Sequence, residues 1–244
     1  MTEHTEPLKL NEIFLEDCLV GMKKMPDNSV DVVITDPDYG VGINYDVEFA
    51  DHSVGVARKT TNELEKELVP ILKECYRVSK RDIVFFWSGS IERIHDFLHI
   101  VELAGLNTTY MGIWYKPNGA GPSGNGLGRR FEVWFWLKGK EPRSSEWKFL
   151  PDVLVHNRIT LRDKEGVKHP TQKPLDLMIR LVRFFSNEGD TVLDPFMGSG
   201  TTAIACKLTG RNYVGFEINP DYIEIANKRL LNITKEVDVG RLFV

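Results

Sequence analysis

Short apolar runs alternate with longer amphipathic segments along most of this chain. Six runs rich in β-branched or aromatic residues have the length of strands, and they cover residues 30–35, 82–87, 108–115, 131–137, 191–194 and 213–217. A parallel strand that is covered on both faces needs such an uninterrupted apolar run. We therefore predict a strand at each of these places.

Segments with apolar residues at helical spacing lie between most of these strands. They cover residues 14–25, 64–78, 91–104, 174–185, 201–208 and 221–231. Pro70 predicts a bend or a new helix start within the second of them. Gly105 and Gly210 predict helix ends, and Asn219 followed by Pro220 predicts a helix start.

This alternation predicts an α/β fold with an open, doubly wound, mostly parallel sheet and helices on both faces. A chain of 244 residues with 42% hydrophobic content can bury one sizeable core, so we expect a single domain. Residues 40–62 are polar and contain glycine, which predicts a mobile loop. Residues 139–168 are polar and irregular, which predicts a short recognition insert.

The composition argues against several classes of protein. No apolar run approaches the roughly 18 residues that a membrane span needs, and the polar, acidic N-terminal segment is not typical of a signal peptide. We therefore expect a cytoplasmic protein without a membrane partner. Cys18, Cys75 and Cys206 lie far apart and form no CxxC pair. We expect them to be reduced and mostly buried, and we expect no metal site.

A net charge of −4 does not favour nucleic acid, so phosphate contacts would need local basic clusters. Residues 116–130 carry three cations and no anion, and residues 158–173 carry five cations against two anions. Ordinary solvated loops have similar compositions. If the partner is a nucleic acid, Arg129 and Arg130 are the best candidates for phosphate contacts, and binding should weaken steeply with salt.

A glycine-rich turn follows the strand at 191–194. Residues 194–202 read DPFMGSGTT, where Gly198 and Gly200 remove Cβ atoms at a place where the backbone must pass close to a ligand. Glu217 ends the next strand, where dinucleotide-binding sheets place an acidic residue on ribose hydroxyls. A P-loop would need a lysine at Thr201, and a dinucleotide site would need a third glycine. A nucleoside cofactor without a pyrophosphate fits best, and a turn without any ligand is the alternative.

A second segment, TDPDYG at residues 35–40, follows the strand at 30–35. An exocyclic base amine is a poor nucleophile because its lone pair is delocalised into the ring. The Asp36 carboxylate and the Pro37 carbonyl can accept the two amine hydrogens, and the Tyr39 ring can stack on the base. A base in a duplex must be flipped out to reach such a pocket. Catalysis there would rest on positioning and electrostatics.

The glycine-rich turn and the strand ending in Glu217-Ile218-Asn219-Pro220 together resemble the S-adenosylmethionine site of amino-directed (N6-adenine/N4-cytosine) DNA methyltransferases. HPTQKP at 169–174 resembles the family segment that packs against the methionine part of this cofactor. The resemblance implies that Glu217 binds the ribose. Asp17 matches an adenine-contacting position more loosely, and a helix-start aspartate is its alternative. The other cofactor residues that the resemblance implies are His169, Thr171, Lys173, Asp194, Phe196, Gly198, Ser199, Gly200 and Thr201.

The order of the two segments carries further information by resemblance. The segment that would hold the amine, TDPDYG, comes first and the cofactor segment, DPFMGSGTT, comes last. The β arrangement of this family has the same order, with the recognition region between the two segments. The resemblance covers most of residues 12–230. It implies a seven-stranded sheet, S-adenosylmethionine as cofactor and DNA as partner, and it leaves a homodimer open. The short recognition insert offers few candidates for base contacts: Arg143, Asn157, Arg158 and Arg162.

Residues 36–39 (DPDY) correspond to a tetrad of the family. This tetrad begins with Asp36, as it does in the adenine N6 enzymes that the chain resembles, whereas cytosine N4 enzymes more often begin it with serine. Cytosine N4 transfer stays an alternative. Transfer to RNA or to a protein glutamine is a weaker one, because those enzymes usually carry the two segments in the reverse order.

Asp38 departs from the family pattern, which has a second proline there. Its presence releases two backbone restraints and adds a negative charge that would raise the pKa of Asp36 if it lay close. We expect weakened activity if Asp38 points into the pocket and a small effect if it points to solvent. A homologue that binds cofactor or DNA without catalysis is the remaining alternative.

Three aromatic runs could be mistaken for base-stacking platforms. They lie at residues 85–87, 114–115 and 134–136, within the predicted strands. The alternation of side chains in strands favours core positions for them.

Overall fold

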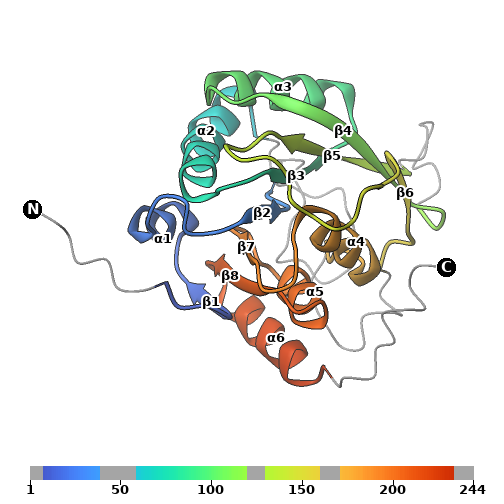
Figure 1. Ribbon diagram of the computed structural model, residues 1–244. Coiled ribbons are helices and arrows are strands. Elements are labelled where there is room, and N and C mark those ends of the chain that lie inside the picture. Colours follow the sequence, from blue (N-terminus) through green and yellow to red (C-terminus); the bar gives the residue numbers. More distant parts are fainter. Residues whose placement is uncertain (1–7, 39–58, 120–129, 160–170, 234–244) are drawn as a thin grey trace, which may run out of the picture.

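The computed structural model describes residues 8–38, 59–119, 130–159 and 171–233 (Figure 1). The strands in these residues are β1 (Glu12–Leu15), β2 (Val32–Thr35), β3 (Ile83–Ser88), β4 (Thr108–Tyr115), β5 (Phe131–Leu137), β6 (Val153–Val155), β7 (Thr191–Asp194) and β8 (Asn212–Glu217). The helices are α1 (Cys18–Lys24), α2 (Thr61–Val78), α3 (Ile91–Leu103), α4 (Leu175–Phe185), α5 (Thr201–Leu208) and α6 (Pro220–Leu231).

All eight strands form one sheet in the order β1-β8-β7-β2-β3-β5-β4-β6. The predicted mostly parallel α/β sheet is confirmed, with β5 antiparallel to both of its neighbours. The number of strands was wrong by one, because the described residues contain eight rather than seven. β1 and β6 were not predicted, since they have four and three residues and each buries one side chain, Ile13 and Leu154.

Two other predictions need correction. Pro70 does not start a new helix, because α2 runs through it from Thr61 to Val78. α2 begins earlier than predicted because Thr60 and Glu63 form a capping box, in which each side chain accepts a hydrogen bond from the other's backbone. Residues 61–62 of the predicted loop are therefore helical, and its residues 40–58 lie outside the described residues.

Two helical layers cover the sheet. Helices α1, α2 and α3 lie on one face, and α4, α5 and α6 lie on the other (Figure 1). The aromatic runs are core for the most part, as predicted. Phe85 and Trp87 pack against Phe97 of α3, while Trp134 packs against Phe185 of α4. Tyr115 is the exception, since 37% of its surface is exposed.

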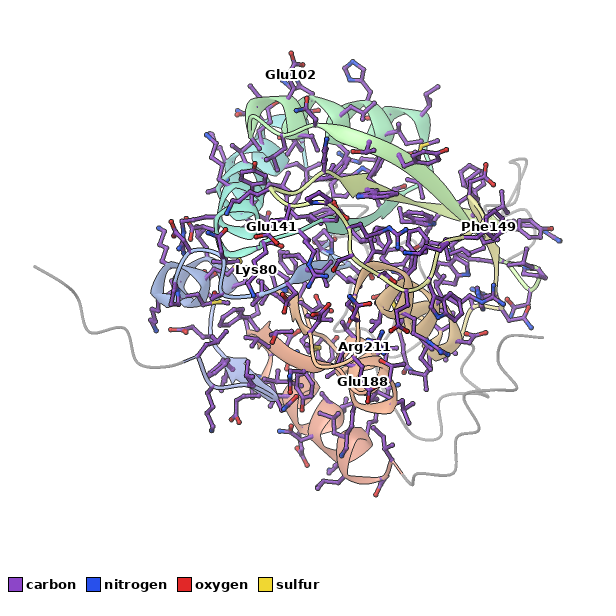
Figure 2. All side chains as sticks on the ribbon, in the orientation of Figure 1. Lys80, Glu102, Glu141, Phe149, Glu188 and Arg211 are labelled. Carbon is purple, nitrogen blue, oxygen red and sulfur yellow. The ribbon has the colours of Figure 1, made fainter. Side chains whose placement is uncertain are left out.

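The first part of the predicted recognition insert is anchored to the sheet. The backbone N–H of Glu141 donates to the carbonyl of Lys80 at 2.9 Å, so the chain after β5 returns beside the turn before β3 (Figure 2). A Cβ at Gly139 would lie 2.0 Å from the Arg81 carbonyl oxygen, so this close approach requires glycine. β6 then pairs with β4 in parallel.

The described residues contain no helix that is long and apolar enough to cross a membrane. They also contain no group of three or more histidine, cysteine or acidic side chains that could hold a metal ion. Cys18, Cys75 and Cys206 are buried and unpaired.

The two predicted segments meet at the point where the strand order reverses. β2 and β7 are adjacent and parallel, with Val33 beside Leu193. The chain leaves β2 for β3 on one side, and it leaves β7 for β8 on the other. Ligands of open α/β sheets bind beyond the carboxyl ends of the strands at such a switch point. Asp36 and Asp194 both lie there.

Gly112 is a packing constraint that can be tested. It lies opposite Trp134, and a Cβ at this position would lie 2.0 Å from two atoms of the indole ring. We expect Gly112→Ala to lower the free energy of unfolding by about 1–3 kcal/mol, because the buried ring must shift. Thr109→Ala is the control, since Thr109 is an exposed residue of the same strand. Equal urea denaturation midpoints for the two variants would refute this account.

Candidate active site

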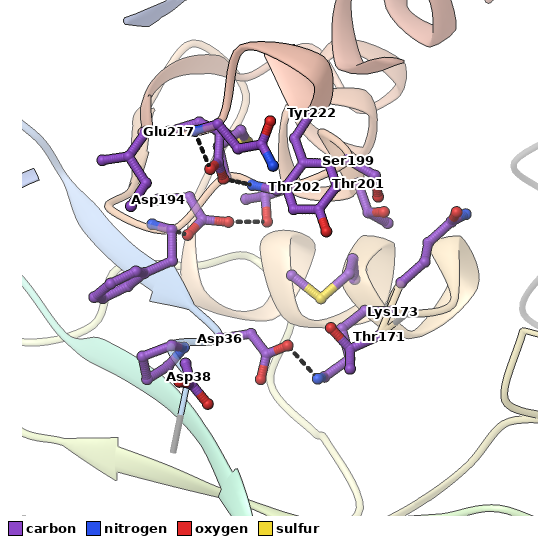
Figure 3. Close-up of a pocket in the computed structure, with 18 of the residues that line it drawn as sticks. Asp36, Asp38, Thr171, Lys173, Asp194, Ser199, Thr201, Thr202, Glu217 and Tyr222 are labelled. Carbon is purple, nitrogen blue, oxygen red and sulfur yellow. Dashed lines mark hydrogen bonds and ion pairs between the residues drawn. The ribbon is translucent and has the colours of Figure 1, made fainter. Parts of the chain in front are cut away.

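A cavity of about 390 Å³ lies at the switch point (Figure 3). Asp36 and Pro37 line it from the end of β2, and Phe196 and Gly198 line it from the turn after β7. Residues 171–173, which precede α4, complete the wall. The volume is in the range of small-molecule sites. The two predicted segments therefore share one cavity.

The turn after β7 has the backbone that its glycines predict. Gly198 and Gly200 have φ values of 52° and 80°, in the left-handed region that side chains with a Cβ rarely adopt. A Cβ at Gly200 would also lie 2.7 Å from the Cβ of Ala226 in α6. Gly198 therefore lines the cavity, whereas Gly200, a predicted cofactor residue, packs against α6 and is not part of the cavity lining.

Glu217 holds this turn in place. Its carboxylate accepts hydrogen bonds from the backbone N–H of Gly198 at 2.8 Å and from that of Asn219 at 2.9 Å. A carboxylate has about four acceptor positions, so both oxygens retain capacity for ligand hydroxyls. Glu217 also lines the cavity (Figure 3).

Asp194 joins the two segments rather than facing a ligand alone. Its carboxylate accepts hydrogen bonds from the hydroxyls of Thr35 at 2.7 Å and Thr202 at 2.5 Å, and from the backbone N–H of Phe196 at 3.1 Å. Burial raises the pKa of Asp194 to about 6, although these donors favour the ionised form. Thr35 directly precedes Asp36, so the hydrogen bond between Thr35 and Asp194 fixes the end of β2 against the glycine-rich turn after β7, which we call the cofactor turn.

Asp36 lies in a cluster of buried charges. Lys173 forms an ion pair with Asp36 Oδ2, and its ammonium also lies 3.2 Å from Glu132 of β5. Lys116 binds the other side of Glu132 at 2.5 Å. Asp36 Oδ1 is buried and has no hydrogen-bond partner within the described residues. Burial raises the pKa of Asp36 to about 6; Lys173 and Lys116 oppose this rise, and Glu132 adds to it.

Glu132 and Lys116 were not predicted as site residues. Glu132 interrupts the apolar run 131–137, and a charged residue inside a buried strand was the signal that could have revealed it. Arg229 was also missed. Its guanidinium donates to the hydroxyls of Ser199 at 3.1 Å and Thr201 at 3.2 Å, which ties the cofactor turn to α6.

Asp38 is an exposed residue that also lines the cavity. Its side chain is 42% exposed and lies 3.5 Å from the ammonium of Lys59, which also binds Glu67 at 2.6 Å. The like charge that raises the pKa of Asp36 comes from Glu132. The charge of Asp38 is therefore balanced by Lys59, which follows residues 39–58 in the sequence.

The remaining cofactor predictions have different outcomes. Thr171 lines the cavity, as do Ser199 and Thr201. Asp17 caps α1 by accepting a hydrogen bond from the backbone N–H of Val20 at 3.0 Å, and it does not line the cavity. Tyr39 and His169 lie outside the described residues.

The two predicted basic clusters meet through Asn118 and Arg158. Asn118 and Arg158 exchange hydrogen bonds of 2.8 Å and 2.9 Å, and the Lys116 N–H donates to the Arg130 carbonyl at 2.7 Å. Arg130 and Arg158 are exposed, whereas Arg129 and Arg162 lie outside the described residues. Arg143, a predicted base contact, packs over the Phe184 ring at 4.1 Å and donates to the Phe184 carbonyl.

Comparison with known proteins agrees with this geometry. Residues 30–228 match the model of a DNA methylase family named for N6 and N4 methyl transfer. The chain belongs to the amino-directed DNA methyltransferases. The type II methyltransferase M.HinfI of Haemophilus influenzae is 30% identical to it, over 92% of this chain and 69% of M.HinfI. M.HpaI of Haemophilus parainfluenzae is 28% identical, over 89% of this chain and 73% of M.HpaI.

Solved structures support the same assignment. The complex of M1.HpyAVI with S-adenosylmethionine superposes on this methyltransferase with a TM-score of 0.65 and 26% identity, over 91% of this chain and 99% of M1.HpyAVI. The PvuII cytosine-N4-specific enzyme has a TM-score of 0.73 over 95% of this chain and 90% of that enzyme. Its identity is only 18%, so it shows the fold alone.

This methyltransferase therefore uses S-adenosylmethionine, which supplies an electrophilic methyl group when bound. The residues present fit such a cofactor. Gly198 has no side chain and lines the cavity with its backbone, and Glu217 lines the same cavity. The Phe196 ring lines it as well.

Glu217 gives a direct test of the cofactor site. We expect Glu217→Gln to weaken S-adenosylmethionine binding by about tenfold, because an amide accepts through only one atom and cannot hold both backbone N–H groups as well as a ligand hydroxyl. Isothermal titration calorimetry measures this affinity. Glu224→Gln on the exposed side of α6 is the control and should bind as the parent does. Unchanged affinity in both variants would exclude Glu217 from the cofactor site.

Proposed function

We propose that this methyltransferase transfers the methyl group of S-adenosylmethionine to the N6 amine of adenine in DNA. The observation that carries the proposal is the placement of Asp36. One carboxylate oxygen of Asp36 has no hydrogen-bond partner in the described residues, and Asp36 lines the same cavity as Gly198 and Phe196 of the cofactor turn.

Asp36 and Pro37 would act on the amine together. The Asp36 carboxylate accepts one amine hydrogen and the Pro37 carbonyl accepts the other, which draws the nitrogen towards tetrahedral geometry and directs its lone pair at the methyl group. Asp36 orients the amine and need not be a strong base, because the methylated, ring-conjugated nitrogen sheds its proton readily. The contribution of the protein is therefore positioning and electrostatics.

The choice of adenine rests on resemblance. Asp36 starts the tetrad, as in adenine enzymes of the family, whereas cytosine enzymes more often start with serine. The order of the segments, with TDPDYG before DPFMGSGTT, favours DNA over RNA or protein as substrate.

DNA must present an unstacked base to this cavity. Arg130 and Arg158 are exposed on neighbouring segments, and they are our candidates for phosphate contacts together with Arg129 and Arg162. The Tyr39 ring is our candidate for stacking on the flipped base. His169, Thr171 and Lys173 retain the cofactor-side position that the resemblance implies, and Asp17 retains the looser one beside the adenine of the cofactor.

Identification of the methylated nucleoside tests the substrate. DNA of varied sequence is incubated with labelled S-adenosylmethionine and digested to nucleosides, and we expect N6-methyldeoxyadenosine. Asp36→Ala should reduce turnover by about 10²- to 10³-fold, as the loss of one preorganised hydrogen-bond partner does elsewhere. N4-methyldeoxycytidine as the product would refute the adenine assignment. Binding of cofactor and DNA without any methyl transfer would refute catalysis.

Asp38→Pro tests whether the departure from the family tetrad weakens the enzyme. Asp38 is half-exposed and paired with Lys59, and such ion pairs contribute about 0–1 kcal/mol. We therefore expect kcat to change by less than about fivefold in steady-state assays, because that free energy corresponds to a factor of about five. Asp38→Asn separates loss of charge from gain of the proline ring. A kcat for Asp38→Pro that is tens of times higher would show that Asp38 attenuates the parent.

A further inference from the structure

Four charged side chains form an alternating row that runs away from the cavity. Asp36 follows β2, Lys173 precedes α4, Glu132 lies in β5, and Lys116 follows β4. Lys173 contacts both carboxylates, and Lys116 contacts Glu132. The two positive and two negative charges balance.

Lys173 is the enclosed member of this row. Its side chain is only 6% exposed, and its ammonium lies 5.2 Å from the centre of the Phe86 ring and 5.7 Å from that of Trp114. An ammonium is removed from water at high cost unless it is paired. Burial lowers the pKa of Lys173, but the two carboxylates raise it more, so the group stays charged.

The contact constrains Asp36 in two ways. It occupies Oδ2, and it leaves the buried Oδ1 without a hydrogen-bond partner among the described residues. It also places a positive charge beside a carboxylate that burial would otherwise favour in the protonated form. A protonated Asp36 would lose much of its ability to accept hydrogen bonds from an amine.

We propose that Lys173 is a positioning residue for methyl transfer: it fixes the rotation of the Asp36 carboxylate and holds that carboxylate ionised, and Glu132 holds Lys173 in place. This inference rests on the proposed role of Asp36. It differs from the cofactor role that resemblance gives to Lys173, because the ammonium acts on the amine-gripping carboxylate.

The charges around Asp36 give opposite expectations for two variants. Glu132 from β5 and Asp194 from β7 are the acidic groups on its neighbouring elements, and Lys173 and Lys116 are the basic ones, with the Asp38 and Lys59 pair also lining the cavity. Loss of Lys173 removes a charge that favours ionised Asp36. Loss of the Glu132 charge removes one that disfavours it.

The experiment is the pH dependence of kcat for the full chain with DNA and S-adenosylmethionine. The parent should lose activity as pH falls through about 6, where Asp36 takes up a proton. Lys173→Met should move this acidic limb upward by about one pH unit or more and lower kcat at neutral pH by about tenfold. Glu132→Gln should move it downward. Lys173→Arg keeps the charge and should keep the limb near that of the parent.

Binding measurements separate the two roles of Lys173. We expect the affinity of Lys173→Met for S-adenosylmethionine to stay within about threefold of the parent value, since the removed contact is to Asp36. Lys228→Met, on the exposed face of α6, is the control for loss of a positive charge. Loss of cofactor affinity with an unmoved acidic limb would overturn the proposal in favour of a cofactor contact.

A second readout does not need turnover. Carbon-13 NMR of the Asp36 carboxyl, assigned by its disappearance in Asp36→Asn, should report a higher pKa in Lys173→Met and a lower one in Glu132→Gln. Equal carboxyl titrations in parent and variants would overturn the positioning role. If the variants show these shifts but the parent does not methylate adenine, the result contradicts the proposed function and leaves the contact between Lys173 and Asp36 intact. If Lys173→Met does not fold, Lys173→Gln and Glu132→Gln carry the same test.

Discussion

The hydrogen bond from the Thr35 hydroxyl to the Asp194 carboxylate is the constraint on which the site depends. It joins the ends of two adjacent parallel strands, and each strand continues into one of the two functional segments. Asp36 follows Thr35 directly, and Phe196 donates to Asp194 from the cofactor turn. A shift between β2 and β7 would therefore move the amine acceptor away from the methyl donor. Reactions that rely on positioning are sensitive to such displacements.

The sequence predicted the centre of the fold well and its edges poorly. β3 and β7 bury every residue, so their apolar runs were unambiguous. β1 and β6 lie at the two edges of the sheet, where a short strand with one buried side chain suffices. Such strands leave little pattern in the sequence. Pro70 does not start a new helix because the packed face of α2 outweighs the loss of one backbone hydrogen bond.

The candidate site divides in the same way. Asp36, Gly198 and Glu217 were predicted because local motifs follow predicted strands. The roles of Glu132, Lys116 and Arg229 depend on which strands and helices become neighbours, and β5 reaches the site only because it is inserted antiparallel beside β3. Asp38 could not be assessed from sequence either, since its partner Lys59 lies beyond residues 39–58. Sequence motifs therefore identified the groups that would contact the ligands, whereas their charged partners could be identified only from the tertiary structure.

The central claim is that Asp36 and Pro37, which hold the amine, and the cofactor turn act on ligands in one shared cavity. A bisubstrate analogue tests it most directly, with deoxyadenosine joined through N6 by a short linker to the position of the sulfonium in a cofactor analogue. The account predicts that this compound binds more tightly than the cofactor analogue alone and that the gain is lost in Asp36→Ala. Binding no tighter than the cofactor half, with equal affinity in parent and variant, would contradict it.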